Sequence, residues 1–318
     1  MTDPLPRIVF MGTPEFAVPS LRSLHNAGCD IAAVVTVPDR AAGRGRKITF
    51  SPVKEYALEH NLYLLQPEKL RDPAFISEMQ SLKADLFVVV AFRMLPEIVW
   101  RIPPLGTFNL HASLLPQYRG AAPINHAIIN GETRTGVTTF LIDSKIDTGM
   151  ILLSRETEIN PDENAGSLHD RLKEIGAGIT VATARGLYAG KLKPVPQKKI
   201  PPARLTTAPR IFPADTIINW REPAVKVHNL IRGLSPYPGA MTLLHRGDSN
   251  LRLKILESKL IDDIREIPGL FIRTEKSRLI VSCVSGAIEI LSLVPEGRKK
   301  MSGSEFLRGF DPSGWELA

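Results

Sequence analysis

Two polar residues in an otherwise apolar segment are the first sign of chemistry in this chain. The segment FNLHA (residues 108–112) reads as a buried strand, yet it carries Asn109 and His111. A polar side chain sealed in a core costs about 1–3 kcal/mol when it lacks a partner. Residues two apart in a strand share one face, so both would stand at the strand end, before the loop SLLPQYRG. A single histidine is more often structural, but this pair before a turn favours a functional site.

A carboxylate is expected close to this pair, and the segment LIDSKIDTGMI (residues 141–151) offers two. Asp143 ends an apolar strand and would serve to cap a turn. Asp147 precedes Thr148 and Gly149, in a tight turn that would direct its carboxylate toward the strand ends. A carboxylate beside His111 would fix the orientation of the ring. Asp147 alone reads as a turn cap; beside the Asn-x-His pattern, we favour a catalytic role.

The residue types Asn, His and Asp suit acyl transfer to an amine. Such a reaction needs a donor for the developing oxyanion, an acceptor for the proton of the attacking amine and a donor for the leaving nitrogen. The chain has no GxSxG motif, so a serine nucleophile is not expected, and Ser113 is better explained by a hydrogen bond within its loop. Cys29 and Cys283 are the only cysteines and lack metal-ligand spacing, which predicts no metal site and fits a reducing cytosol.

Alternating strands and helices are expected to position these residues. The predicted strands cover residues 7–12, 31–37, 62–66, 86–92, 107–112 and 136–142, and the predicted helices cover residues 14–27, 51–60, 72–82, 94–101, 121–130 and 167–191. This alternation predicts a Rossmann-like, mostly parallel sheet, which binds ligands at the carboxyl ends of its strands. The turn FMGTPEF has one glycine where a dinucleotide-binding loop needs three, so a nicotinamide site is not expected.

The composition changes after residue 190. Residues 191–210 contain five Pro and six basic residues and no acidic one, which predicts an extended linker. Short alternating runs follow and predict a small antiparallel β-barrel of the OB-like type. The expected organisation is therefore a catalytic domain (residues 1–190), a basic linker (residues 191–210) and a C-terminal barrel (residues 211–318).

Positive charge is concentrated in the last third of the chain. Residues 191–318 hold 21 Lys and Arg against 13 Asp and Glu, whereas residues 1–190 are close to neutral. This pattern fits either a polyanionic partner, such as nucleic acid, or a solvated basic surface. The longest apolar run, residues 86–92, is too short to cross a membrane, and the N-terminus lacks the pattern of a signal peptide.

Four motifs resemble the methionyl-tRNA formyltransferase family of folate-dependent enzymes: MGTPEFAVPSL, NLHASLLPQYRGAAPI, GVTTFLIDSKIDTGMIL and INW. The resemblance implies transfer of a formyl group from 10-formyltetrahydrofolate to an amine. It implies that Asn109 and His111 polarise the formyl oxygen and stabilise the tetrahedral intermediate, while Asp147 holds His111 and assists proton transfer. It also implies a folate site formed by residues 89–96 and 113–116, with contacts from Val90, Phe92, Ser113, Leu114, Leu115 and Pro116.

The segment PDRAAGRGRKITFSPVK (residues 38–54) bears on the acceptor. It resembles the loop that, in the tRNA enzymes, enters the acceptor stem, and clustered cations bind phosphates. Its expected tRNA-binding residues are Arg40, Arg44, Arg46 and Lys47. The resemblance therefore implies formylation of methionyl-initiator tRNA for translation initiation, by a cytoplasmic monomer without membrane contact.

Alternatives remain at this stage. A mobile, solvated loop is common for such a composition. A formyltransferase for sugar nucleotides or glycinamide ribonucleotide would lack the basic loop, and an RNA-binding module would not need an intact Asn-His-Asp set. Arg93 stands where the family commonly has Gly, and its side chain would either meet the folate or point away from it.

Overall fold

The chain forms two compact units in a computed structural model that describes residues 5–42, 47–261, 266–272 and 278–317. Unit 1 comprises residues 1–120, 136–157 and 169–207, and unit 2 comprises residues 121–135, 158–168 and 208–318. Residues 121–135 and 158–168, which the sequence places in the catalytic domain, thus group with the C-terminal part of the chain. The proposed domain boundaries at residues 190 and 210 stay predictions.

Unit 1 is built on a seven-stranded sheet with the order β10-β9-β7-β6-β1-β2-β5. The strands of this part of the chain are β1 (Arg7–Gly12), β2 (Asp30–Val35), β3 (Arg40–Ala42), β4 (Lys47–Thr49), β5 (Leu64–Leu65), β6 (Leu86–Val90), β7 (Thr107–His111), β8 (Arg119–Gly120), β9 (Arg134–Leu141) and β10 (Ile151–Glu158). The pairs β1–β2, β1–β6, β2–β5 and β6–β7 are parallel, and β7–β9 is antiparallel. The predicted mostly parallel sheet is confirmed.

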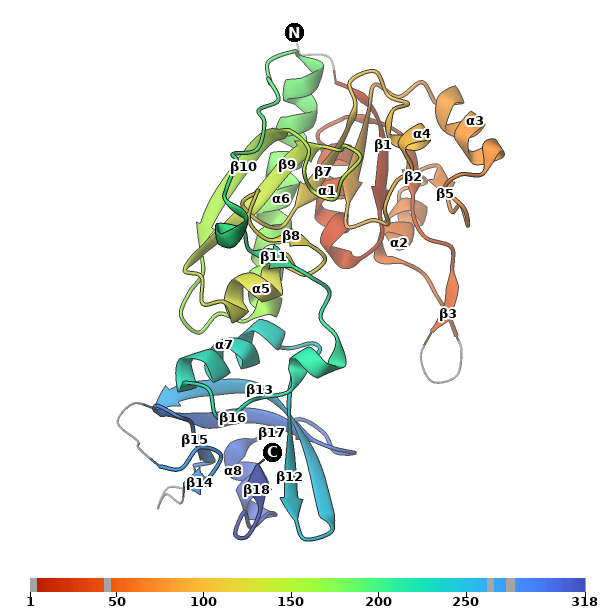
Figure 1. Ribbon diagram of the computed structural model, residues 1–318. Helices are drawn as coiled ribbons and strands as arrows, with labels where there is room; N and C mark the ends of the chain where they lie inside the picture. Colours follow the sequence, from red (N-terminus) through yellow and green to blue (C-terminus); the bar gives the residue numbers. More distant parts are fainter. Residues whose placement is uncertain (1–4, 43–46, 262–265, 273–277, 318) are drawn as a thin grey trace. The chain divides into compact units, whose positions relative to one another are not determined.

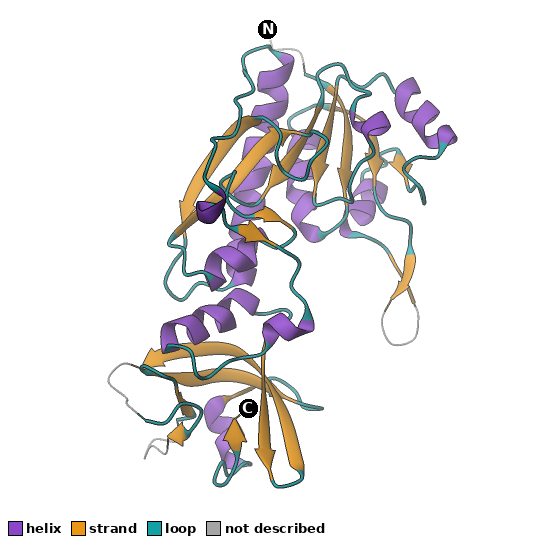
Figure 2. Ribbon diagram, viewed as in Figure 1, coloured by secondary structure: helices purple, strands orange, loops and turns teal. Residues whose placement is uncertain are grey.

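The helices of unit 1 lie along this sheet, as Figures 1 and 2 show, whereas α5 (Pro123–Ile129) groups with unit 2. The helices of this part of the chain are η1 (Glu15–Ala17), α1 (Val18–Asn26), α2 (Pro52–Glu59), α3 (Pro73–Ser81), α4 (Glu97–Trp100), α5 (Pro123–Ile129), α6 (Ala165–Tyr188) and η2 (Pro202–Arg204). Two of them begin with a capping side chain followed by proline: Ser51 accepts a hydrogen bond from the Lys54 amide before α2, and Asp72 accepts one from the Ala74 amide before α3.

Burial explains why these strands form and why one was missed. All five residues of β6 are buried, as a central parallel strand requires. By contrast, β10 was not among the predicted strands. It lies at the edge of the sheet, and Ser154, Arg155 and Glu156 in its middle are exposed, so it gives no buried-strand pattern.

Unit 2 contains the second sheet, which is antiparallel and has the order β14-β15-β16-β13-β12-β18, with β17 paired to β16. The elements of this part of the chain are β11 (Thr207–Ala208), η3 (Pro213–Thr216), α7 (Ala224–Leu234), β12 (Ala240–Arg246), β13 (Ser249–Ile261), β14 (Phe271–Ile272), β15 (Ile280–Ser282), β16 (Ala287–Pro295), β17 (Met301–Ser302), α8 (Gly303–Arg308) and β18 (Glu316–Leu317). The sheet curls into a half-barrel with α7 against it, so the expected antiparallel second domain is confirmed (Figure 2).

The INW motif lies in the core of unit 2. Ile218 and Trp220 are both buried there, and the Trp220 indole donates a hydrogen bond to the Thr242 hydroxyl at 2.9 Å. Two residues of α5 also belong to this unit: Asn125 donates to the Gly233 carbonyl at 2.7 Å, and His126 donates to the Pro209 carbonyl at 3.0 Å. Among the described residues, no helix has the length and apolar character needed to span a membrane.

Candidate active site

The carboxyl end of β7 presents Asn109 and His111. In the parallel register, Asn109 lies beside Val89 of β6, and Val90, the last residue of β6, lies beside Leu110. Phe108 and Leu110 are buried, whereas Asn109 is the least buried residue of the strand. The alternation of a strand thus sends the apolar side chains to one face and the polar pair to the other.

His111 is fixed by its neighbours. Its Nε2 lies 2.8 Å from the carbonyl oxygen of Tyr118 and, because a carbonyl only accepts, the ring donates at this atom. Its Nδ1 lies 3.8 Å from Oδ2 of Asp147, and both side chains are largely buried. The two chain segments that meet at the ring are therefore the loop after β7 and the turn between β9 and β10.

Asp147 is held in a conformation that few side chains adopt. Its φ is +53°, and that of Tyr118 is +58°; such left-handed positions cost on the order of 1 kcal/mol or more outside glycine and cluster at functional sites. The carboxylate Oδ2 accepts a hydrogen bond from the Gly120 amide at 3.0 Å. The strained turn brings the carboxylate to the histidine.

Asp143 has a different position. Both of its carboxylate oxygens accept from the Thr148 hydroxyl, at 2.8 and 2.9 Å, and one also accepts from the Lys145 amide at 2.9 Å. These bonds close the turn between β9 and β10. Of the two carboxylates that the sequence offers, Asp147 is therefore the one beside His111.

The loop expected to contact folate is tightly hydrogen-bonded. Ser113 is fully buried, its hydroxyl donates to the Gln117 carbonyl at 2.7 Å, and its carbonyl accepts from the Thr138 hydroxyl at 2.7 Å. Its side chain thus serves the loop rather than acting as a nucleophile. Leu115 and Pro116 are buried and Leu114 is half-buried. On the neighbouring strand end, Val90 is buried, and Phe92 packs against the core formed by β1, β2 and β6.

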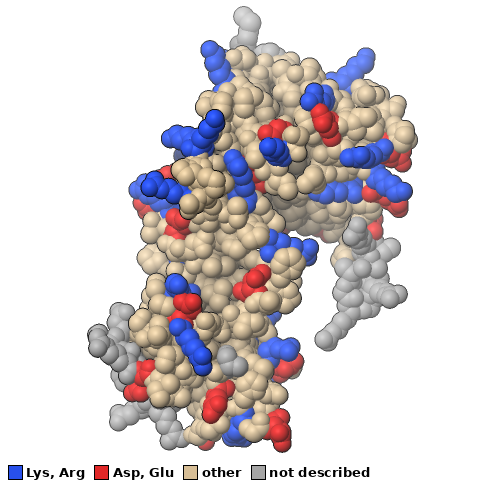
Figure 3. All heavy atoms as spheres, in the orientation of Figure 1, with Lys and Arg blue, Asp and Glu red and all other residues tan. Residues whose placement is uncertain are grey.

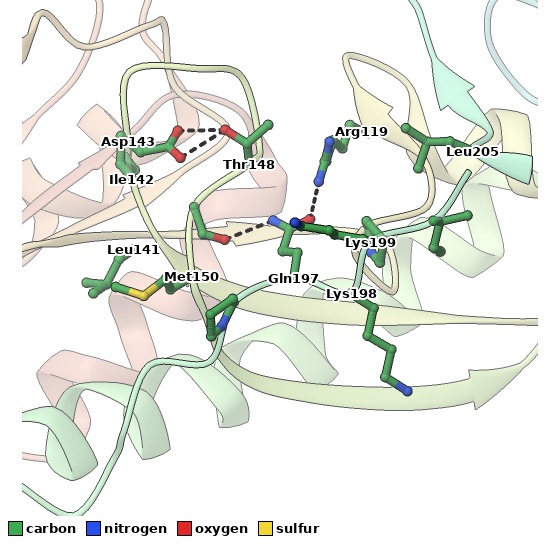
Figure 4. A pocket seen from close by; sticks show the side chains of 14 residues that line it. Arg119, Leu141, Ile142, Asp143, Thr148, Met150, Gln197, Lys198, Lys199 and Leu205 are labelled. Carbon is green, nitrogen blue, oxygen red and sulfur yellow. Dashed lines mark hydrogen bonds between the residues drawn. The ribbon is translucent and has the colours of Figure 1, made fainter. Parts of the chain in front are cut away.

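A cavity of about 770 Å³ lies beside the Asp147 turn in unit 1 (Figure 4). It is lined by Pro116, Arg119, Leu141, Ile142, Asp143, Thr148, Gly149, Met150, Pro196, Gln197, Lys198, Lys199, Ile200 and Leu205. Its wall includes the segment that the sequence predicts to be only a linker. Gln197 reaches from that segment to the turn, a contact that a proline-rich sequence gave no means of predicting.

The basic segment after β2 forms a hairpin. Strands β3 and β4 pair antiparallel, and Figure 1 shows the hairpin standing away from the large sheet. Arg40 and Lys47 belong to its strands, whereas Arg44 and Arg46 lie outside the described residues. On the face drawn in Figure 3, basic and acidic side chains are interspersed over both units. In the described part of the chain, no three His, Cys, Asp or Glu side chains gather as metal ligands would.

The base of this hairpin is anchored by charge. Lys54 of α2, largely buried, lies 2.5 Å from Oδ2 of Asp39, and the Gln66 amide donates to Oδ1 at 2.9 Å. Hydrogen bonds from Lys54 and then Gln66 lower the pKa of Asp39, so this carboxylate is charged at neutral pH. The Lys54 ammonium also lies 3.9 Å from the centre of the Phe50 ring.

Known families match both parts of the chain. The formyl transferase family matches residues 6–183, and the formyl transferase C-terminal domain matches residues 210–311. The chain belongs to the formyl transferase family.

Relatives within this formyl transferase family are close. Methionyl-tRNA formyltransferase of Bacteroides fragilis is 47% identical, over 96% of this chain and 95% of the relative. That of Flavobacterium johnsoniae is 48% identical, over 95% and 96%. Among solved structures, an N-formyltransferase of Helicobacter canadensis, in complex with folinic acid and dTDP-3-aminofucose, has a TM-score of 0.67 and 20% identity, and the match covers 89% of this chain and 98% of that one.

One departure from the formyl transferase pattern has a structural explanation. The Arg93 guanidinium donates to the carbonyl of Glu68 at 3.0 Å and also to the carbonyl of Pro67. It therefore ties the segment after β6 to the segment after β5, and both of these strands belong to the same sheet.

Proposed function

We propose that this protein transfers the formyl group of 10-formyltetrahydrofolate to the amino group of methionyl-initiator tRNA, and that Asn109, His111 and Asp147 carry out the transfer. The supporting observation is that Asn109 and His111 share one face at the end of β7, with His111 Nδ1 3.8 Å from Oδ2 of Asp147. The reaction is inferred from relatives that match nearly the whole chain and are named methionyl-tRNA formyltransferases.

The roles of the three residues follow from their chemistry. The transfer forms a bond between the amine nitrogen and the formyl carbon and breaks the bond to the leaving nitrogen of folate, so a proton moves from the first nitrogen to the second. Asn109 supplies an amide donor for the charge that develops on the formyl oxygen. Asp147 has one oxygen engaged by Gly120, and its other oxygen is the acceptor for the amine proton. His111 lies beside that carboxylate and is proposed to polarise the formyl oxygen together with Asn109.

The folate substrate is proposed to bind along the ends of β6 and β7. Val90 and Phe92 offer apolar contacts there, and Ser113, Leu114, Leu115 and Pro116 form the loop that follows His111. The folinic acid complex of the Helicobacter canadensis enzyme is consistent with a folate site on this fold. Because the loop is braced by Ser113 and Thr138, it offers a preformed surface.

The tRNA acceptor is supported by the hairpin as well as by the relatives. Arg40, Arg44, Arg46 and Lys47 are proposed to contact phosphates, and the anchored base limits the cost of holding the hairpin in place. An aminosugar nucleotide is the second candidate acceptor, since one solved structure contains it. That structure is only 20% identical, so it supports the fold alone. The relatives named methionyl-tRNA formyltransferases are 46–48% identical and therefore favour tRNA as the acceptor.

We further propose a cytoplasmic monomer with a catalytic domain of residues 1–190, a linker of residues 191–210 and a tRNA-binding domain of residues 211–318. Sedimentation of the purified protein at micromolar concentration tests the oligomeric state. A mass near 35 kDa is expected.

The function is tested by offering the purified enzyme 10-formyltetrahydrofolate with one acceptor at a time. The acceptors are methionyl-initiator tRNA, a methionyl-elongator tRNA, a dTDP-aminosugar and glycinamide ribonucleotide. Formylation of the initiator tRNA, with at least ~10²-fold lower kcat/KM for both small acceptors, is expected because only the tRNA engages the hairpin. Efficient transfer to a small acceptor, with none to tRNA, would overturn the proposal.

A further inference from the structure

Both the nitrogen and the oxygen of the Gln197 side-chain amide form hydrogen bonds with segments close to His111. Its Nε2 donates to the carbonyl oxygens of Asp147 and Gly149, both at 2.9 Å, and its Oε1 accepts from Nη2 of Arg119 at 2.6 Å. Figure 4 shows Gln197 between Arg119 and the turn that carries Thr148. One side chain thus joins two segments that are distant in the sequence.

These two segments also supply the groups that lie around His111. The Asp147 turn supplies the carboxylate, and the neighbours of Arg119 supply the Tyr118 carbonyl bound to the ring and the Gly120 amide bound to the carboxylate. A shift of either segment would change the separation between ring and carboxylate.

The turn is also confined from its other side. A Cβ atom on Gly149 would lie 1.6 Å from the Leu141 carbonyl oxygen, so the turn is pressed against the end of β9. The left-handed conformation of Asp147 is strained and persists only where surrounding contacts over-determine it. The two hydrogen bonds from Gln197 are contacts of this kind.

We propose that Gln197 is a positioning residue for formyl transfer: it holds the Asp147 turn against the loop after β7, and so sets the carboxylate relative to His111. This inference rests on the proposed function, in which Asp147 acts in the transfer. The geometry needs an amide, because the site presents two carbonyl acceptors and one guanidinium donor. Glu would supply no donor for the carbonyls, and Met would supply no donor and only a weak acceptor.

A double-mutant cycle tests the proposal. Gln197→Met, of similar length, is measured in the otherwise unaltered enzyme and in an Asp147→Ala background, with 10-formyltetrahydrofolate and methionyl-initiator tRNA. In the first background kcat should fall ~10-fold or more, with KM for both substrates within ~3-fold, because misplacing a reacting group is costly. In the second background the same substitution should have little further effect.

A matched control is Gln117→Met. Gln117 also joins the loop after β7 to the segment before β11, donating to the Arg204 carbonyl at 2.9 Å and accepting from the Thr206 amide at 2.7 Å, and both of these partners lie outside the Asp147 turn. A loss of kcat as large as that of Gln197→Met would overturn the positioning role, since it would show a general effect of loosening this segment.

The remaining outcomes separate the inference from the proposed function. Near-normal transfer by Asp147→Ala would contradict the proposed function. A large loss in Asp147→Ala together with normal kcat in Gln197→Met, or an equal loss from Gln197→Met in both backgrounds, would contradict only this inference. If Gln197→Met does not fold by circular dichroism, Gln197→Glu, which keeps the length and the acceptor, takes its place in the cycle.

Discussion

His111 shows how single residues of this site depend on atoms outside their own strand. Its ring nitrogens lie next to the Tyr118 carbonyl and the Asp147 carboxylate, and neither partner is in β7. The Asn-x-His spacing predicts that both side chains share a face, but it carries no information on which carboxylate reaches the ring. That choice depends on the turn between β9 and β10, in which hydrogen bonds from Lys145 and Thr148 occupy the Asp143 carboxylate.

Replacing His111 tests the proposed catalytic set directly. His111→Ala should lower kcat by ~10²-fold or more, because a group that polarises the formyl oxygen is lost. The measurement is formylation of methionyl-initiator tRNA at saturating folate, with circular dichroism and a thermal unfolding curve to establish that the variant is folded. A folded variant with nearly normal turnover would contradict the assignment of His111.

The two cysteines should be unreactive in the folded protein. Both are free and buried, burial raises the pKa of Cys29, and burial raises the pKa of Cys283 to about 12. Since the thiolate is the reactive form, an aromatic disulfide reagent at pH 8 should label neither thiol in buffer and both in guanidinium chloride. Rapid labelling of a thiol in the native protein would contradict this burial.

Among the elements, strands with mostly apolar residues can be predicted from the sequence, whereas strands with exposed polar residues cannot. The central strands β1, β6 and β7 lie within the predicted ranges because burial makes most of each run apolar, although β7 also carries Asn109 and His111. The edge strand β10 escaped prediction because half of its residues face solvent, and the hairpin of β3 and β4 lies in a segment that reads as a loop.

The hairpin base gives an element-scale prediction. Asp39→Asn breaks the ion pair with Lys54 and should raise KM for tRNA by ~3-fold or more, leaving KM for folate unchanged, because a loosened hairpin must be ordered upon binding. Steady-state kinetics with each substrate varied in turn measures both constants.

Asp39→Asn also removes a negative charge, so the test needs a control for charge alone. Removing an acidic residue would by itself improve binding to a polyanion. The matched control is Glu55→Gln, which removes one negative charge from the exposed side of α2 without touching the hairpin base. It should leave KM for tRNA equal or slightly lower, and a similar rise in both variants would contradict an anchoring role.

For the whole molecule, the sequence predicts two domains, and the structure shows two units with different boundaries. Residues 121–135 and 158–168 group with the C-terminal unit, where Asn125 and His126 donate to backbone carbonyls of that unit. Asn125 and His126 bind carbonyls 108 and 83 positions away, and no local pattern in these segments encodes partners at such distances.

The pH dependence of stability is a prediction for the C-terminal unit. His228 is buried, its Nδ1 lies 3.0 Å from the Ser258 hydroxyl, and burial followed by the charge of Arg232 lowers its pKa below the usual 6.5. Below pH 6.5 the unfolded chain therefore binds a proton that the folded chain does not, and stability should fall as pH decreases from 7 toward 5. Each unit by which folding lowers the pKa of His228 corresponds to a loss of about 1.4 kcal/mol of stability at low pH.

His228→Gln should flatten this dependence while keeping a polar partner for Ser258. Unfolding midpoints in urea at several pH values between 5 and 7.5 measure the effect. A variant with the same pH slope as the unaltered protein would show that His228 does not cause it. His169, a half-buried histidine, is the control, since His169→Gln should leave the slope unchanged.

The sequence by itself determined the class of sheet, the two-domain character, the face that Asn109 and His111 share and the formyl transferase resemblance. Each of these depends on local periodicity or on short motifs. Only the tertiary structure decided that Asp147 reaches His111, that Arg93 binds the segment after β5 and that Gln197 joins the Asp147 turn to the loop after β7. These contacts join residues 25 to 78 positions apart, and their geometry is set by how the strand ends, turns and linker pack, which no local pattern encodes.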